Sequence, residues 1–145
     1  MNTDKESGLG PLVGTWRLKS EVATFSDTGE RVEPHGSDPE SWMTLSAGGR
    51  IMFLFGAANR RPAKSDADRA TLFNTMVAYT GKVRLDEPGR IVTTVDLAMN
   101  PLIHGEQVRF FSLADNRLAI RSAEQTFPIF GERLLVIDLV WIREL

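Results

Sequence analysis

Cysteine is absent from the 145 residues of this chain. Without it the protein cannot form disulfide bonds, thiolate zinc sites or a cysteine nucleophile. Long apolar runs are absent too, so no segment is expected to span a membrane, and the first eleven residues lack the apolar core of a signal peptide. The net charge of −2 provides no positive field that would attract nucleic acid. These absences predict a cytoplasmic protein without a nucleic-acid partner.

Catalytic and cofactor motifs are equally scarce. The two histidines, His35 and His104, fall in separate expected loops, whereas a metal site needs several converging ligands. No G-x-S-x-G motif marks a serine nucleophile. The pair Gly48 and Gly49 is better explained as a hairpin turn than as a phosphate-binding loop. We therefore predict no metal and no cofactor.

Alternation of apolar and polar residues dominates the chain. Residues 16–22 divide between two faces, with Trp16, Leu18, Ser20 and Val22 on one and Arg17, Lys19 and Glu21 on the other. This pattern is typical of a half-buried strand, and turn-forming residues divide much of the remaining chain into similar segments. The sequence predicts an all-β fold, an up-and-down antiparallel β-barrel of about 8–10 strands.

One short helix is expected near residues 65–77. Ser65 is a favourable N-cap, and Asp66 and Asp68 would lie in the first turn, where the helix dipole favours negative charge. An apolar stripe able to lie against a barrel mouth follows at helical spacing: Ala70, Phe73, Met76 and Val77. A curved sheet wrapped around helices is the competing layout, but it would need helices near the N-terminus, where none is indicated.

The organisation expected is a single domain with a short tail. Residues 1–11 are largely polar and are predicted to form a flexible tail, and residues 12–145 a barrel domain. Its first and last strands are predicted to pair and close the barrel. Gly14 permits a sharp turn before Trp16, and Arg143, on the same strand face as Trp141, would lie over the Trp16 ring.

Several fragments resemble the bacterial and fungal lipocalin-like domain family in their order and spacing: residues 14–18, 42–46, 79–81, 100–101, 105–110 and 139–141. The resemblance extends from about Leu12 to Glu144. The Gly-x-Trp start with a late arginine is also similar to the wider lipocalin and fatty-acid-binding superfamily. The resemblance implies a barrel with a cavity for an apolar or polyketide-like molecule. It does not imply one activity, because members of such families range from carriers to isomerases and cyclases.

Candidate ligand-binding residues follow from strand faces. Apolar groups able to line a cavity, or equally to form plain core, are Met43, Met52, Phe53 and Phe55. Tyr79, the only tyrosine, shares its expected inner face with Val77, Gly81 and Val83, so its hydroxyl needs a partner or a ligand. Gln107 and Arg109 share a face of a strand with a mixed pattern, which a bulge near Phe110 would explain. They form either an exposed polar face or, inside, a buried guanidinium that demands an acidic or carbonyl partner.

Two functions from different classes remain open. The first is a barrel that binds a small apolar or weakly anionic molecule without chemistry of its own. The second is a cyclase- or isomerase-type enzyme that uses Tyr79 and Arg109 to polarise a carbonyl. Asp96 and Asp138 are not favoured as acids or bases, because alternation directs them outward. A solid barrel without a ligand is a third possibility, and a cavity below ~300 Å³ would favour it.

Self-association is also expected. The last strand is apolar on both faces, with Leu134, Val136, Val140 and Ile142 opposite Trp141. An uncovered apolar outer face usually marks a contact surface. We therefore predict a homodimer.

Overall fold

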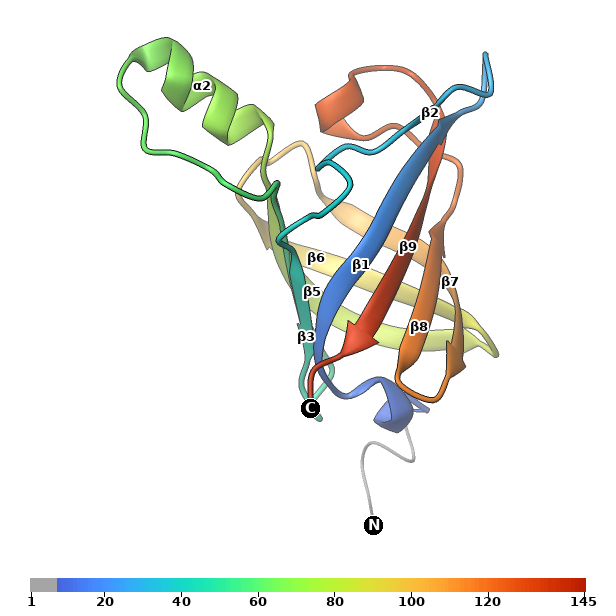
Figure 1. The fold of residues 1–145 in the computed structure, drawn as a ribbon. Coiled ribbons are helices and arrows are strands. Elements are labelled where there is room, and N and C mark those ends of the chain that lie inside the picture. The colour runs from blue at the N-terminus through green and yellow to red at the C-terminus, as the bar shows by residue number, and fades with distance from the viewer. Residues whose placement is uncertain (1–7) are drawn as a thin grey trace.

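The computed structural model describes residues 8–145. Within them, eight antiparallel strands close into a barrel, and a ninth, short strand pairs with the end of one of the eight (Figure 1). The strands are β1 (Gly14–Phe25), β2 (Arg31–Val32), β3 (Trp42–Leu45), β4 (Arg50–Phe55), β5 (Val77–Glu87), β6 (Arg90–Ala98), β7 (Gly105–Ala114), β8 (Arg117–Ser122) and β9 (Leu135–Arg143). Three short helical segments accompany them in this range: η1 (Gly10–Leu12), α2 (Asp66–Asn74) and η2 (Pro128–Phe130).

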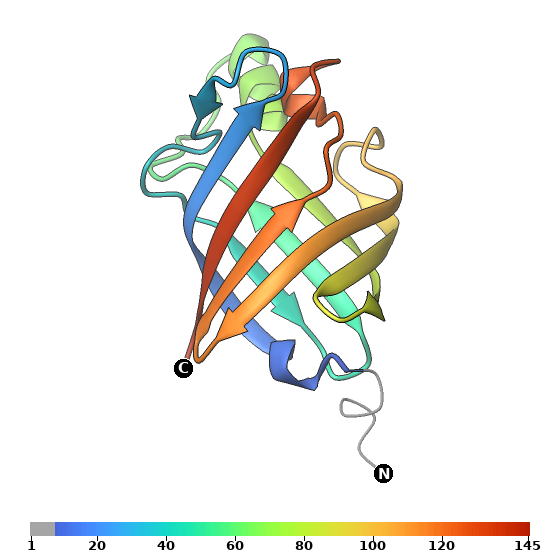
Figure 2. The same ribbon diagram turned by 90° about the vertical axis from the view of Figure 1, so that its right-hand side faces the viewer.

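The strands follow chain order around the barrel. β1 pairs with β3, each later strand pairs with the next, and β9 returns to pair with β1. The short β2 pairs only with Ala23 and Thr24 of β1. Figure 2 shows the tilt of the strands around the barrel axis. The predicted all-β, up-and-down barrel and its number of strands are confirmed.

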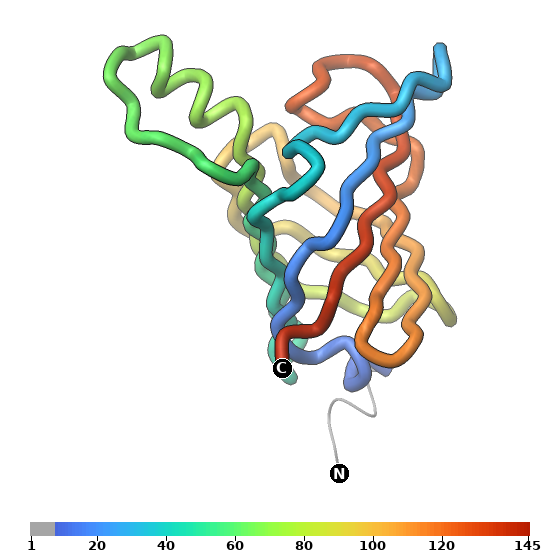
Figure 3. Tube along the Cα trace, viewed as in Figure 1, coloured from blue at the N-terminus to red at the C-terminus, as the bar shows by residue number. Residues whose placement is uncertain are grey.

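The predicted pairing of the first and last strands is also confirmed. β1 and β9 run side by side, as Figure 3 shows, and Trp16 lies opposite Arg143. Trp16 and Trp141 are fully buried. The guanidinium carbon of Arg143 lies 4.2 Å from the centroid of the Trp16 ring, close enough for a cation–π interaction. Arg143 also donates to the backbone carbonyls of Val13 and Pro11, at 2.9 and 2.6 Å.

η1 closes this end of the barrel. The indole nitrogen of Trp16 donates to the Leu12 carbonyl at 3.0 Å, and both Leu9 and Leu12 are buried. Gly14, at φ +138°, brings the chain close beneath Arg143: a Cβ atom there would lie 3.1 Å from the arginine Nη1. Of the tail predicted at residues 1–11, residues 1–7 lie outside the described part. Leu9, near the end of the predicted tail, belongs to the packed core.

The predicted faces of β1 are wrong beyond its middle. The register between β1 and β9 shifts between Leu18 and Ser20, so Lys19 is an extra residue in the ladder. Because one inserted residue exchanges the two faces of a strand, Glu21 points inward and is buried. Ala23 and Phe25 follow it on the inner face, in place of the expected Ser20 and Val22.

The bulge predicted near Phe110 is not present, because β7 pairs with both neighbouring strands without a register shift. Its inner face therefore carries Gln107 and Arg109, and Phe110 is exposed outside.

The predicted helix is present but shorter. The Ser65 hydroxyl accepts a hydrogen bond from the Asp68 amide at 3.1 Å, which confirms the N-cap, and α2 ends at Asn74 because Val77 begins β5. Figure 1 shows α2 standing out from the barrel rather than across its mouth. It buries no residue, and only its end, with Phe73, reaches a groove beside residues 100–103 and 128–129. No helix within residues 8–145 is long and apolar enough to cross a membrane.

Candidate ligand-binding pocket

A cavity occupies the half of the barrel interior at the η2 end. Strands β1 and β4 to β9 form its walls, and three segments cover it: residues 34–35, 102–103 and 125–129. Its volume is about 90 Å³, whereas pockets for drug-sized ligands span ~300–1,000 Å³. The cavity therefore falls below the size expected for such a ligand, and by the criterion given above its volume favours a barrel filled by its own side chains.

Aromatic rings form one wall of the cavity. Phe53 on β4 lies directly opposite Tyr79 on β5, with ring centroids 4.9 Å apart. Phe53 also stacks with Phe55 at 5.7 Å, and the Phe55 ring meets the edge of Trp141 at 5.6 Å. Interlocked rings of this kind are rigid, so they offer a flat apolar surface to a ligand.

Arg109 supplies a positive charge to the opposite wall. Its side chain is buried, with 9% of the residue surface exposed. The guanidinium donates to the carbonyl of Val108 at 2.8 Å and to the side-chain oxygens of Gln125 and Gln107 at 3.0 and 3.3 Å. All of these acceptors are neutral, and none of the carboxylates within residues 8–145 forms an ion pair with Arg109. No carboxylate of the described residues therefore pairs directly with this guanidinium, and the one carboxylate in the lining, Glu21, is bonded to His35 instead.

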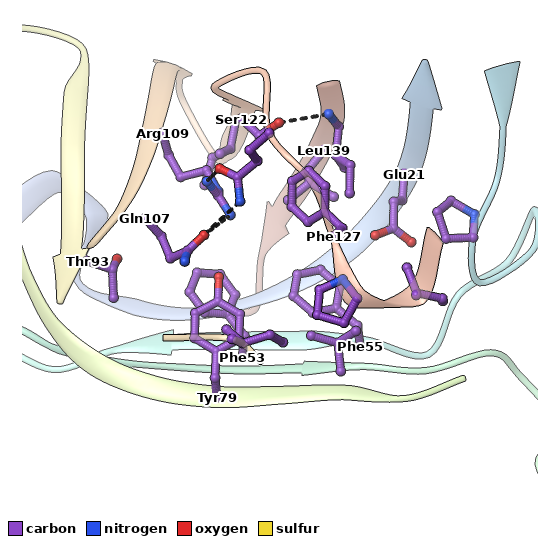
Figure 4. Close-up of a pocket in the computed structure, with 18 of the residues that line it drawn as sticks. Glu21, Phe53, Phe55, Tyr79, Thr93, Gln107, Arg109, Ser122, Phe127 and Leu139 are labelled. Carbon is purple, nitrogen blue, oxygen red and sulfur yellow. Dashed lines mark hydrogen bonds between the residues drawn. The ribbon is translucent and has the colours of Figure 1, made fainter. Parts of the chain in front are cut away.

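Tyr79 lies close to this charge. Figure 4 shows its hydroxyl pointing from the aromatic wall toward Gln107 and Arg109. Burial raises the pKa of Tyr79 above its usual value, while the charge of Arg109 and a hydrogen bond with it lower this pKa in part. The phenol is therefore protonated at neutral pH and can donate a hydrogen bond.

A buried acid–histidine pair completes the lining. The Nδ1 atom of His35 lies 2.7 Å from the Oε1 atom of Glu21, and their side chains are 2% and 5% exposed. Pro34 and His35 belong to a loop that folds over β1, and both residues of the pair line the cavity. The imidazole stacks against Phe55, with centroids 6.1 Å apart.

The segment that covers the pocket is attached to the wall by the bonds of Gln125 and by the rings of Phe127 and Phe130, which pack against the core. Gln125 pairs with Leu135 through two backbone hydrogen bonds, and its side-chain amide donates to Gln107 at 2.9 Å. Beyond it, η2 contains no buried residue, although Phe127 lies against the Arg109 guanidinium at 5.7 Å. We call residues 125–130 the cap.

Five of the six expected ligand-binding residues come together here: Phe53, Phe55, Tyr79, Gln107 and Arg109. Met43 faces inward but lies in the core near η1, with Leu9, Leu12 and Leu45, and does not reach this cavity. Trp16, Trp141 and Arg143 are likewise outside its lining.

Sequence reasoning missed Glu21, His35 and Gln125. Glu21 faces inward only because Lys19 is an extra residue in the ladder between β1 and β9, and no residue of β1 indicates that insertion. His35 stands between Pro34 and Gly36, where a surface loop is the ordinary expectation. Gln125 was part of an expected connector, and only the return of the chain over the barrel brings it to Arg109.

Asp96 and Asp138 lie outside the pocket, as alternation predicted. Asp96 pairs with Arg50 at 2.9 Å and Asp138 with Arg121 at 3.6 Å, all on the outer surface. The hydrogen bond from Arg50 lowers the pKa of Asp96. No group of three or more His, Asp or Glu side chains in residues 8–145 is placed to hold a metal ion.

Comparison with known proteins agrees with this architecture. The model of a family described as a lipocalin-like domain matches residues 13–143. None of the curated proteins compared with the chain matches it.

Proposed function

The chain belongs to the lipocalin-like domain family, and we propose that its barrel binds a small, flat, apolar molecule that carries an anionic or carbonyl oxygen. One observation carries this proposal: the buried Arg109 guanidinium faces the cavity with only neutral partners. A buried charge is expensive unless it is paired. An oxygen of the ligand would supply the missing partner, and the planar donor fork of arginine suits a carboxylate, enolate or phenolate.

The surroundings of Arg109 support a flat ligand. Phe53 and Phe55 offer ring faces, and Tyr79 offers a hydroxyl donor beside the guanidinium. An apolar wall with a few fixed polar groups is the usual composition of a small-molecule site.

The cavity of about 90 Å³ limits how such a ligand is held. A molecule larger than a few heavy atoms requires the cap to move outward, and we propose that the cap opens for entry and closes over the ligand. Because Gln125 bonds both Arg109 and Gln107, a ligand oxygen that engages Arg109 would replace one of the bonds that hold the cap.

The test uses two matched probes, the anion 2-naphthoate and its neutral amide, 2-naphthamide, titrated into the protein by isothermal calorimetry. We expect the anion to bind more tightly, and Arg109→Leu to weaken it about tenfold or more, the range for a hydrogen bond to a charged group. The affinity for the amide should fall much less in the same variant. Equal losses for both probes, or no binding of either, would contradict the proposal.

A further inference from the structure

The Glu21–His35 pair is not explained by recognition of an anion at Arg109. It combines a carboxylate and an imidazole that are both nearly inaccessible to solvent, joined by a 2.7 Å hydrogen bond. The second imidazole nitrogen, Nε2, is buried and has no hydrogen-bond partner within residues 8–145. Buried polar atoms are rarely left without a partner, and because His35 lines the cavity, its Nε2 atom is available to a ligand there.

The chemistry of the pair defines what that group is. A carboxylate only accepts hydrogen bonds, so Glu21 requires the proton of the neutral ring to be on Nδ1. In this neutral form of the ring the lone pair lies on Nε2, which is then an acceptor whose orientation is held by the carboxylate. A hydroxyl group of a ligand is the complementary donor.

The position of the pair defines where the hydroxyl lies on the ligand. Glu21 and His35 line the same cavity as Arg109. Figure 4 shows Glu21 across the pocket from Gln107 and Arg109, with Phe53 and Phe55 between them. A ligand that touches both polar groups must therefore extend along the aromatic wall.

We propose that Glu21 and His35 form a second polar binding site in the pocket, which accepts a hydrogen bond from a phenolic or enolic hydroxyl of the ligand. The ligand class is then a flat molecule with two polar ends, an acidic or carbonyl oxygen at Arg109 and a hydroxyl at His35. This inference rests on the proposed function and adds the second end of the ligand to it.

A merely structural role for the pair has a different consequence. The bond between Glu21 and His35 also attaches the loop around residue 35 to β1, and that attachment would stabilise the barrel whether or not a ligand is present. In that case, removing the pair would change stability but would not change which ligands are preferred. The experiment therefore measures preference rather than affinity alone.

The probes form two pairs of different length that differ only in the hydroxyl: 4-hydroxybenzoate with benzoate, and 6-hydroxy-2-naphthoate with 2-naphthoate. In the unaltered protein we expect at least one hydroxylated probe to bind about threefold to tenfold more tightly than its partner, the effect of one hydrogen bond. The double variant Glu21→Leu/His35→Phe removes both polar groups together and keeps a ring against Phe55. It should bind both members of each pair equally.

Two further variants keep the result interpretable. Glu21→Gln retains an acceptor for Nδ1 but removes the charge, and it should reduce the preference for the hydroxyl without abolishing binding of 2-naphthoate. His104→Gln alters the other, exposed histidine and should leave the preference unchanged. A preference that persists in the double variant, or is absent from the unaltered protein while 2-naphthoate still binds, would overturn the inference alone. Failure of every probe to bind would overturn the proposed function with it.

Nitrogen-15 NMR provides a direct readout. The chain has only two histidines, so the ring nitrogens of His35 can be followed with His104 as an internal reference. We expect the hydroxylated probe, but not its partner, to shift the Nε2 resonance of His35. A shift of equal size with both probes, or at His104 instead, would contradict a hydroxyl contact.

Discussion

Arg109 on β7 donates a hydrogen bond of 3.0 Å to the Oε1 atom of Gln125, at the start of the cap. The charge that would bind a ligand is therefore also one of the groups that hold the cap against the barrel wall. An anion that takes the donors of Arg109 competes with this bond, so ligand binding and release of the cap are expected to be linked.

Gln125→Glu tests this competition from within the protein. The new carboxylate would lie within bonding distance of Arg109 and neutralise its charge, so we expect the affinity for 2-naphthoate to fall about tenfold or more. The neutral 2-naphthamide should be affected less, and Gln125→Leu, which adds no charge, should not reduce anion binding to the same extent. Calorimetric titration of each variant with each probe measures these affinities. An unchanged affinity of Gln125→Glu for 2-naphthoate would argue against Arg109 as the anchor.

Trp16→Ala removes the largest side chain at the η1 end. Trp16 is fully buried between η1 and Arg143. We expect the free energy of unfolding to fall by about 3–5 kcal/mol, the usual effect of deleting a buried aromatic ring. Urea denaturation followed by circular dichroism measures it. A loss below ~1 kcal/mol, in the range of surface substitutions, would contradict closure of the barrel at this residue.

Gly81→Ala tests a second place where the backbones are close. A Cβ atom at Gly81 would lie only 2.2 Å from the carbonyl oxygen of Thr94 on the neighbouring strand, next to a register shift between β5 and β6. We expect a loss of about 1–3 kcal/mol in the free energy of unfolding. Gly48→Ala is the matched control, because its nearest neighbour would be 3.9 Å away. Equal free energies of unfolding for the two variants would show that β6 can shift to accommodate the Cβ atom without strain.

Tyr79 provides a pH signal that belongs to one residue, because it is the only tyrosine. Its pKa is raised above the usual 10.0, so the folded state holds the phenolic proton more tightly than the unfolded state does. The resulting stabilisation is full below pH 10.0 and is lost as the pH rises through the folded pKa. Phenolate absorbance should therefore appear at higher pH in the native protein than in concentrated urea. Coincident titration curves would contradict burial of the hydroxyl.

Homodimer formation remains a prediction from the outer face of β9. Leu134, just before β9, is 48% exposed, and Val136, Val140 and Ile142 on the strand are half-buried. α2 projects away from the barrel beside β5 rather than over this face (Figure 1). We expect light scattering to give the mass of a dimer, and Val140→Lys to give a monomer, whereas Met52→Lys on another exposed apolar face should remain dimeric. A monomer at high micromolar concentration would refute the prediction.

The sequence alone predicted the class of fold and the composition of one wall of the pocket. Alternation placed Tyr79 on an inner face, and Phe53 and Phe55 were candidates because they are aromatic. The two ends of the chain carried the Trp16–Arg143 contact. Met43 and Met52 were candidates because they are flexible and apolar, but Met43 faces inward at another height along the barrel and Met52 is exposed. Period-two alternation identifies the face of a residue, whereas height depends on how that strand is aligned with its neighbours.

The tertiary structure alone decided the Glu21–His35 end of the site and the position of Gln125. Glu21 points inward because Lys19 is an extra residue in the ladder with β9, and that register is set by hydrogen bonds to a strand more than a hundred residues away. His35 and Gln125 lie on segments without regular periodicity, and they reach the pocket because closure of the barrel brings their loops over its mouth. Local patterns determine which side chains a strand can present, but long-range pairing determines which of them meet.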